Sequence, residues 1–221
     1  MFRSVVITID GPAGAGKSTV ARAVARRLGF RFLDTGALYR AATWAALQAG
    51  IAMDDPAAVV RLVRGLRFEL DDDGETQRVR VDGRDVTAEI RNEGLARHIF
   101  RVADPPEVRA ELGRLQRAYA EGRDVVTEGR DQGTEVFPDA ARKVYLDASL
   151  PERARRRAVE LAARGFAVDP GRVEADLRDR DARDRARPVG ALRPAADAVV
   201  LDTTGMAVDE VVDRIVALVR S

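Results

Sequence analysis

Residues 11–18, GPAGAGKS, combine residue types and spacing that suit phosphate chemistry. They match the phosphate-binding loop pattern G-x-x-x-x-G-K-[ST] at every fixed position. The glycines allow backbone conformations in which successive N–H groups point at phosphate oxygens. Lys17 supplies a mobile positive charge for the outer phosphates of a nucleotide, and Ser18 supplies a hydroxyl for Mg²⁺. This stretch therefore predicts a binding site for a nucleoside triphosphate.

The segments on either side of the loop supply the structure that such a motif needs. Residues 5–9 are a short β-branched run, which is typical of a buried parallel strand. Val20, Val24 and Leu28 recur at four-residue spacing after the loop, which predicts one apolar face of a helix. The start of that helix would direct the positive end of its dipole at a phosphate. A chance turn of glycine and alanine explains this order of strand, loop and helix poorly.

The composition excludes several kinds of chemistry. The 221 residues suit a single domain, and they include no cysteine, so disulfides, thiolate catalysis and zinc–thiolate sites are excluded. His98 is the only histidine, which leaves no histidine triad or metal cluster to assemble. The 37 basic residues are balanced by 36 acidic ones, which argues against a nucleic-acid-binding protein held by bulk charge. No apolar run approaches membrane-spanning length, and we expect a cytoplasmic protein without a signal peptide.

Strands and helices alternate along the rest of the chain. Further strands are predicted at 30–33, 124–127, 144–146 and 198–201, and helices at 38–47, after Pro56, at 108–119 and at 208–219. This alternation predicts an α/β fold with a five-stranded, doubly wound parallel sheet flanked by helices. Between residues 68 and 81, apolar and charged residues alternate on both sides of the polar turn 71–74. That pattern predicts a small β-hairpin at the surface, outside the central sheet.

Residues 152–187 are dense in arginine. On a helix, Arg180, Asp184 and Arg187 would fall at i, i+4 and i+7, along one face. One interpretation is a solvated helix whose charges pair with one another on the surface. The other is a mobile lid, because an enzyme that transfers phosphoryl groups needs arginines beyond its glycine loop to hold the transferring group and exclude water. The residue pattern leaves both interpretations open.

Four segments, taken in order, closely resemble the bacterial cytidylate kinases: GPAGAGKST, LDTGALYR, EGRDQGTEVFPDA and RDARDRARPVGALRPAADAVVLD. The resemblance runs from the first strand to the terminal helix. It implies a single P-loop nucleoside monophosphate kinase domain over residues 1–221, with a core at about 1–60, 97–150 and 188–221. The resemblance further implies a monophosphate-binding insertion at about 61–96, which contains the hairpin, and an arginine-rich helical lid at about 151–187. The implied reaction transfers the γ-phosphoryl group of ATP to CMP or dCMP, giving ADP and CDP or dCDP.

The resemblance also implies roles for individual residues. ATP would be bound by Gly11, Pro12, Ala13, Gly14, Ala15, Gly16, Lys17, Ser18, Thr19, Arg156 and Arg157. CMP would be bound by Thr35, Tyr39, Arg40, Arg109, Arg130, Asp131, Arg180 and Asp184. The catalytic residues would be Lys17, Arg130, Arg180 and Arg187. Mg²⁺ would be held by Ser18 and, through a water molecule, by Glu128.

Several of these residues also have ordinary structural explanations. Tyr39, Arg40 and Arg109 could lie on helix surfaces, and Asp131 could cap the turn that follows its strand. Glu128 ends a strand at the same edge as the loop, and a structural role fits it as well as the orientation of Mg²⁺-bound water. One position departs from the family pattern, which often has a serine nine residues before the arginine that corresponds to Arg109. This chain has Phe100 there, and a phenylalanine cannot make the hydrogen bond of a serine hydroxyl to the base.

Other functions remain open on the residues alone. A kinase for another nucleoside monophosphate, such as UMP, would share the loop and the arginines, and would differ in the base contacts of Arg109 and Asp131. A regulatory module that binds ATP without catalysis would not need so many arginines of the phosphate-binding type. An arginine-rich RNA-binding protein is disfavoured by the interleaved acidic residues. We expect a monomer whose partners are ATP and CMP or dCMP, with Mg²⁺ as cofactor and with neither nucleic acid nor membrane.

Overall fold

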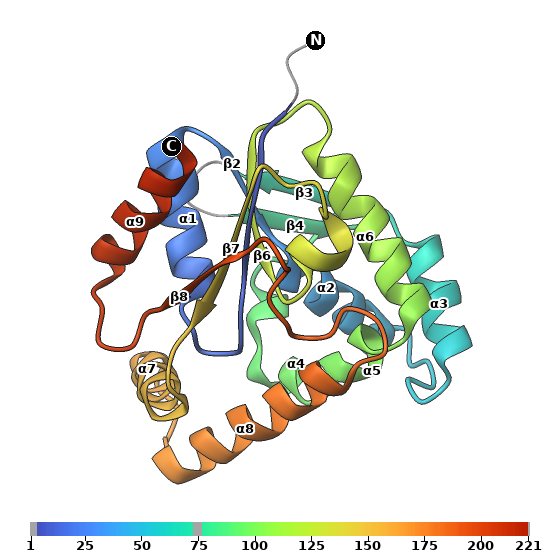
Figure 1. Ribbon diagram of the computed structural model, residues 1–221. Helices are drawn as coiled ribbons and strands as arrows, with labels where there is room; N and C mark the ends of the chain where they lie inside the picture. Colours follow the sequence, from blue (N-terminus) through green and yellow to red (C-terminus); the bar gives the residue numbers. More distant parts are fainter. Residues whose placement is uncertain (1–3, 73–76, 221) are drawn as a thin grey trace.

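A five-stranded parallel sheet forms the centre of the structure, a computed structural model that describes residues 4–72 and 77–220 (Figure 1). Its strands are β1 (Val6–Asp10), β2 (Arg31–Asp34), β6 (Val125–Gly129), β7 (Arg142–Asp147) and β8 (Val199–Asp202). They are ordered β2-β6-β1-β7-β8, and every neighbouring pair is parallel. The predicted fold class is therefore confirmed.

Helices cover both faces of this sheet and its carboxyl edge. The longer ones are α1 (Lys17–Leu28), α2 (Thr35–Gln48), α3 (Pro56–Gly65), α6 (Pro106–Ala120), α7 (Leu150–Ala163), α8 (Pro170–Ala186) and α9 (Val208–Arg220). Short helical turns are η1 (Glu89–Arg91), α4 (Glu93–Ala96), α5 (Ile99–Ala103) and η2 (Gln132–Val136). In Figure 1, α1 and α9 lie on one side of the sheet, α3 and α6 lie on the other, and α7 and α8 lie beyond the ends of the strands. Within the described residues, no helix is long and apolar enough to cross a membrane.

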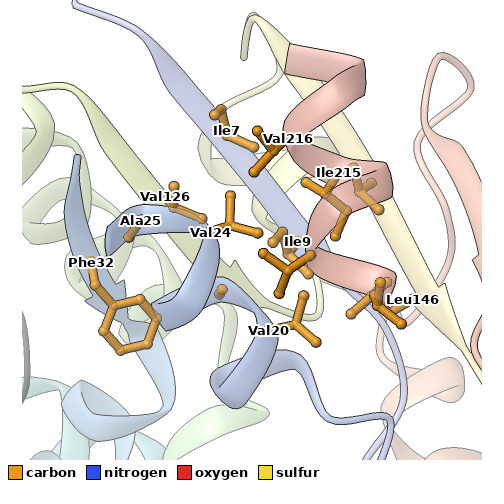
Figure 2. Close-up of a cluster of buried hydrophobic side chains, with 14 of the residues drawn as sticks. Ile7, Ile9, Val20, Val24, Ala25, Phe32, Val126, Leu146, Ile215 and Val216 are labelled. Carbon is orange, nitrogen blue, oxygen red and sulfur yellow. The ribbon is translucent and has the colours of Figure 1, made fainter. Parts of the chain in front are cut away.

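The main core lies between the sheet and the α1–α9 pair (Figure 2). Val20 and Val24 of α1 and Ile215 of α9 are buried against Ile7 and Ile9 of β1. These are the apolar positions whose spacing predicted the two helices. Each such side chain contributes about 1.5–3 kcal/mol by leaving water, so this cluster anchors the strand and the helix that flank the glycine loop.

A separate antiparallel sheet is formed by β3 (Phe68–Asp72), β4 (Gln77–Val81) and β5 (Arg84–Asp85). The predicted surface hairpin is thereby confirmed, although part of its turn, at residues 73–74, lies outside the described residues. The third strand was not predicted. The sheet is joined to the edge of the central sheet by side chains, since Asp72 Oδ2 accepts from Phe32 N at 2.9 Å and Gln77 Oε1 accepts from Asp34 N at 2.9 Å.

Helix α2 begins three residues earlier than the apolar pattern indicated. Asp34 is the reason, because its Oδ1 accepts a hydrogen bond from Ala37 N at 2.9 Å and so caps the first turn. The earlier start brings Thr35 into the helix, directly at the carboxyl end of β2. The acceptor-site residues predicted on α2 are thus held close to the sheet edge where β6 and β1 also end.

Candidate active site

The glycine loop joins β1 to α1, as the motif requires. Gly11 packs so closely on β7 that a Cβ there would lie 2.0 Å from the carbonyl oxygen of Leu146. Gly16 has a φ of 86°, which side chains rarely adopt, and it precedes the first residue of α1. That first residue is Lys17, which is buried and whose Nζ donates to the carbonyl oxygen of Pro12 at 2.7 Å. The loop therefore forms a ring of backbone groups closed by the lysine.

Ser18 and Glu128 meet beside this ring. Ser18 Oγ donates to Glu128 Oε1 at 2.8 Å, and Glu128 lies at the carboxyl end of β6. Burial, with the nearby charge of Asp34, raises the pKa of Glu128. Burial, with the nearby charge of Arg130, lowers the pKa of Lys17. A hydroxyl and a carboxylate are hard oxygen donors, so this pair fits the ligand preference of Mg²⁺.

A cavity of about 470 Å³ opens next to the loop. It lies between the loop, α7 and the start of α9, and its lining includes Gly14, Gly16, Thr19, Arg156, Arg157, Thr203, Met206 and Val208. Arg156 is held there by Glu152 at 2.9 Å and by the carbonyl oxygen of Thr203 at 2.6 Å. This volume is in the range of small-molecule sites. Thr203 and Met206 were not predicted to line a site, because the sequence carries no signal for them.

Arg109 and Asp131 form a buried ion pair, with side chains only 5% and 7% exposed. Arg109 Nη1 also donates to the carbonyl oxygen of Ala103 at 2.8 Å, and its guanidinium lies 5.4 Å from the centroid of the Tyr39 ring. Arg109 and Tyr39 are therefore not helix-surface residues, and burial raises the pKa of Tyr39 to about 12. The Asp131 carboxylate makes no capping bond to the turn η2 that it precedes. Arg109 and Asp131, which were predicted to bind the same base, are thus in contact although they lie 22 positions apart in the sequence.

Asp184 lies at the centre of an arginine cluster. Its Oδ2 is 3.0 Å from Arg130 Nε, and its Oδ1 is 2.7 Å from Arg187 Nη2. Burial opposes ionisation of this carboxyl, but Arg130, Arg187 and Arg180 together keep its pKa below the usual value. Arg187 Nε is also 2.7 Å from Asp104 Oδ1, which ties the end of α8 to α5. The cluster is an anion-binding environment beside the glycine loop.

The predicted helical face of Arg180, Asp184 and Arg187 needs a correction. Helix α8 ends at Ala186, and Arg187 has extended backbone, with φ −60° and ψ 136°. The reason is local, because the residue that precedes a proline is disfavoured in the helical region and Pro188 follows. Arg187 nevertheless reaches Asp184 from beyond the helix end.

In the described part of the chain, Arg180 is the arginine of this cluster that is not paired with a carboxylate. It makes no hydrogen bond or ion pair to any residue in the ranges 4–72 and 77–220. Burial, with repulsion from Arg130, lowers its pKa to about 10. A bound anion would relieve both unfavourable effects.

The remaining residues that were predicted to bind the acceptor lie at the start of α2. Thr35 Oγ1 donates to the carbonyl oxygen of Glu128 at 2.8 Å, and Arg40 Nη2 is 2.8 Å from Asp34 Oδ2. Arg40 is half-buried, so it is not an ordinary surface residue of the helix. Phe100, where the family often has a serine, lies 5.4 Å from the guanidinium of Arg183 on α8. Its ring therefore contacts α8.

Asp10, Arg153 and Asp181 are buried charged residues beside the site that were not predicted from the sequence. Asp10, at the end of β1, accepts from Gln132 N at 2.9 Å and from Gly133 N at 2.8 Å, and so holds the turn that carries Asp131. Burial raises the pKa of Asp10 to about 7, although these two N–H groups lower it. Arg153 on α7 and Asp181 on α8 form a further ion pair. A lone aspartate directly before the loop was a usable signal for the first, but nothing in the arginine-rich stretch singled out the other two.

The chain is similar to known proteins over nearly its whole length. The family model described as cytidylate kinase matches residues 7–221. A cytidylate kinase of Rhodopirellula baltica is 51% identical over 98% of this chain and 93% of that protein, and one of Desulfitobacterium hafniense is 46% identical over 99% and 94%.

Fold similarity extends to a more distant kinase. A shikimate kinase structure from Acinetobacter baumannii has a TM-score of 0.50 at 18% identity, over 98% of this chain and 93% of that one. At this identity the likeness concerns the fold alone. The match to the family model and the two close relatives show that the chain belongs to the cytidylate kinase family.

Proposed function

We propose that this protein transfers the γ-phosphoryl group of ATP to the 5′-phosphate of CMP or dCMP, giving ADP and CDP or dCDP. The observation that carries the proposal is the placement of the buried Arg109–Asp131 pair and the Asp184 arginine cluster at the same sheet edge as the glycine loop. A regulatory module that only binds ATP would not require a second group of residues suited to a base and a phosphate. Membership of the cytidylate kinase family supports the same reaction.

The donor half binds ATP through the loop. The N–H groups of residues 11–16 and the charge of Lys17 bind the β- and γ-phosphates, and Thr19, Arg156 and Arg157 line the cavity that accommodates the nucleoside. Ser18 and Glu128 fit Mg²⁺, which when bound neutralises charge on the outer phosphates. Lys17 would leave its contact with the Pro12 carbonyl and follow the γ-phosphoryl group.

The acceptor half binds the monophosphate. Asp131 accepts from the exocyclic amino group of cytosine, and Arg109 donates to the other base edge. Arg40 and Arg130 bind the 5′-phosphate, Thr35 and Tyr39 line the site, and Arg180 with Asp184 holds the ribose. An ionised carboxylate only accepts, which favours cytosine over uracil.

The transfer needs no covalent enzyme intermediate. An oxygen of the acceptor phosphate attacks the γ-phosphorus, the bond from that phosphorus to the β–γ bridging oxygen breaks, and ADP leaves. Lys17, Arg130, Arg180 and Arg187 neutralise charge on the equatorial oxygens during this step. Catalysis is therefore positioning and electrostatics in a site from which α7 and α8 exclude water.

We also infer the wider setting of this activity. The chain acts as one domain, with its core at about 1–60, 97–150 and 188–221, its monophosphate-binding insertion at about 61–96 and its lid at about 151–187. The protein is a cytoplasmic monomer that uses Mg²⁺ and binds neither nucleic acid nor membrane. The balanced charge of the chain supports the exclusion of nucleic acid.

An acceptor screen tests the function. Purified protein with ATP and Mg²⁺ would be offered CMP, dCMP, UMP, AMP and GMP in turn, with ADP release as the readout. CMP and dCMP are expected to support turnover at least about a hundredfold faster in kcat/KM than the purine nucleotides. Turnover that is largest with UMP would favour the UMP kinase alternative, and ATP binding without turnover on any acceptor would favour the regulatory module.

A further inference from the structure

An ion pair outside the predicted site makes hydrogen bonds to the backbone of the glycine loop. Arg153 Nη1 of α7 is 2.6 Å from Asp181 Oδ2 of α8, and these side chains are 6% and 2% exposed. The same Nη1 donates to the carbonyl oxygen of Ala13 at 3.0 Å, while Asp181 Oδ1 accepts from Ala13 N at 3.3 Å. The N–H group and the carbonyl oxygen of Ala13 are thus both hydrogen-bonded to the same ion pair.

Two further contacts make this junction rigid. Arg153 Nε donates to the carbonyl oxygen of Ala148 at 2.9 Å, which anchors the arginine to the chain just after β7. A Cβ on Gly14 would lie 3.1 Å from the Cβ of Arg153, so the loop backbone rests directly on α7. The next atoms outward are apolar, since Ala13 packs with Ala154, Val173 and Leu177.

Stability alone does not account for this pair. The apolar contacts already hold α7 and α8 to the loop, and a buried ion pair is often no more stabilising than apolar side chains of similar volume. The pair instead fixes the orientation of α7 and α8 relative to the loop, because its hydrogen bonds are satisfied in only one arrangement of α7, α8 and Ala13.

That arrangement sets the positions of the groups that act on phosphate. Asp181 follows Arg180 directly and lies almost one helical turn before Asp184, which holds Arg130 and Arg187. On the loop side, Ala13 follows Pro12, whose carbonyl oxygen accepts from Lys17. A rotation of α8 would therefore move Arg180 and Asp184 relative to the loop lysine.

We propose that Arg153 and Asp181 are positioning residues for phosphoryl transfer. They fix the positions of α7 and α8 relative to the glycine loop, so that Arg180 and Lys17 can contact the same phosphoryl group. The pair touches no substrate and acts through Ala13 and α8. This assignment rests on the proposed function for its kinetic consequence, although the structural link itself does not depend on which acceptor is used.

Kinetics of matched variants test the proposal. Asp181→Asn keeps the shape of the side chain, and Arg153→Met keeps most of its apolar stem. Each is expected to lower kcat about tenfold or more, with much smaller changes in the KM values for ATP and CMP, because a displacement of about 1 Å costs transition-state contacts first. The double variant should be no slower than the slower single variant, since the pair acts as a unit. Arg153→Lys keeps the charge and should recover part of the rate.

The control is Arg178→Met on the same helix. Arg178 is 61% exposed and pairs with Glu174 at 2.7 Å, so its loss should leave kcat unchanged. The proposal is overturned if Asp181→Asn and Arg153→Met, assayed well below their Tm, keep kcat within about twofold of the wild type. If either variant fails to fold, Arg153→Lys decides. The single nitrogen of lysine cannot replace both Nε and Nη1 of Arg153, so kcat should still fall severalfold, and a wild-type kcat overturns the proposal.

Hydrogen exchange separates this inference from the proposed function. In Asp181→Ala the Ala13 amide loses its acceptor, so a peptide that covers the loop should exchange faster than in the wild type or in Arg178→Met, with ATP present. Unchanged exchange overturns the structural link even if CMP is phosphorylated. Faster exchange in a protein that phosphorylates no monophosphate would refute only the proposed function.

Discussion

Replacement of Asp131 by asparagine removes the charge that we expect to select the base, with almost no change in shape. The carboxylate is 7% exposed and is paired with Arg109, so water cannot substitute for a lost contact. Cytosine presents an amino donor to this carboxylate, whereas uracil presents a carbonyl acceptor. The asparagine amide can rotate to accept from the first or to donate to the second.

The magnitude follows from the burial. A hydrogen bond to a charged group contributes about 1.5–3 kcal/mol, and a buried acceptor left facing another acceptor costs about 1–3 kcal/mol. A difference of about 4 kcal/mol corresponds to roughly a thousandfold preference for CMP over UMP in kcat/KM. In Asp131→Asn the two bases each gain one neutral hydrogen bond, so the preference should fall to within about tenfold.

The variant also leaves the guanidinium of Arg109 without its carboxylate, which should lower kcat/KM for both nucleotides. That loss is common to both and cancels in the ratio, so the assay is the CMP:UMP ratio of kcat/KM and not either rate alone. Asp139→Asn is the matched control, because Asp139 is an exposed carboxylate in the same segment and should leave the ratio unchanged. An Asp131→Asn enzyme that keeps the wild-type ratio would refute the assignment of base selection to this carboxylate.

Three further predictions concern other parts of the site. Lys17→Ala should keep the wild-type Tm within a few degrees while kcat falls by several decades, and a near-wild-type kcat would contradict the proposed mechanism. Burial raises the pKa of Asp10 to about 7 in the folded protein, whereas in the unfolded chain its pKa should lie near the ordinary value of 3.8. Between these two pH values the folded protein therefore holds a proton on Asp10 that the unfolded chain has released. The free energy of unfolding should therefore decrease as pH rises from about 4 to 7 and then level off, and Asp10→Asn should flatten this slope in denaturant titrations; an unchanged slope would place the titration elsewhere. Gly190→Ala would place a Cβ 2.3 Å from Nε of Arg109 and should raise the KM for CMP by about tenfold while the KM for ATP is unchanged. Gly122→Ala has a similar positive φ but no atom within 4 Å of its Cβ, so it controls for backbone strain, and equal KM values in the two variants would argue against the clash.

Features encoded in contiguous residues were predicted correctly from the sequence. The strand, loop and helix around Lys17 follow one another directly, so residue types and spacing alone indicate both the structure and its phosphate chemistry. Periodicity likewise predicted the apolar faces of α1 and α9, because burial on one side of a helix leaves a pattern with a period of 3.6. The start of α2 was predicted late, since its first turn depends on the Asp34 cap and not on apolar spacing.

Partners distant in sequence were decided only by the tertiary structure. The order β2-β6-β1-β7-β8 brings the ends of separate strands to one edge, and no local pattern encodes that order. The periodicity of apolar residues indicates which face of a helix is buried, but not which residues it is buried against. The sequence therefore could not distinguish the buried pair of Arg153 and Asp181 from the exposed arginine–acid pairs of the same stretch. Arg180 shows the same limit. Like Arg183 and Arg185 of the same helix, it makes no ion pair to a residue in the ranges 4–72 and 77–220, and only the packing of α8 buries it beside Arg130.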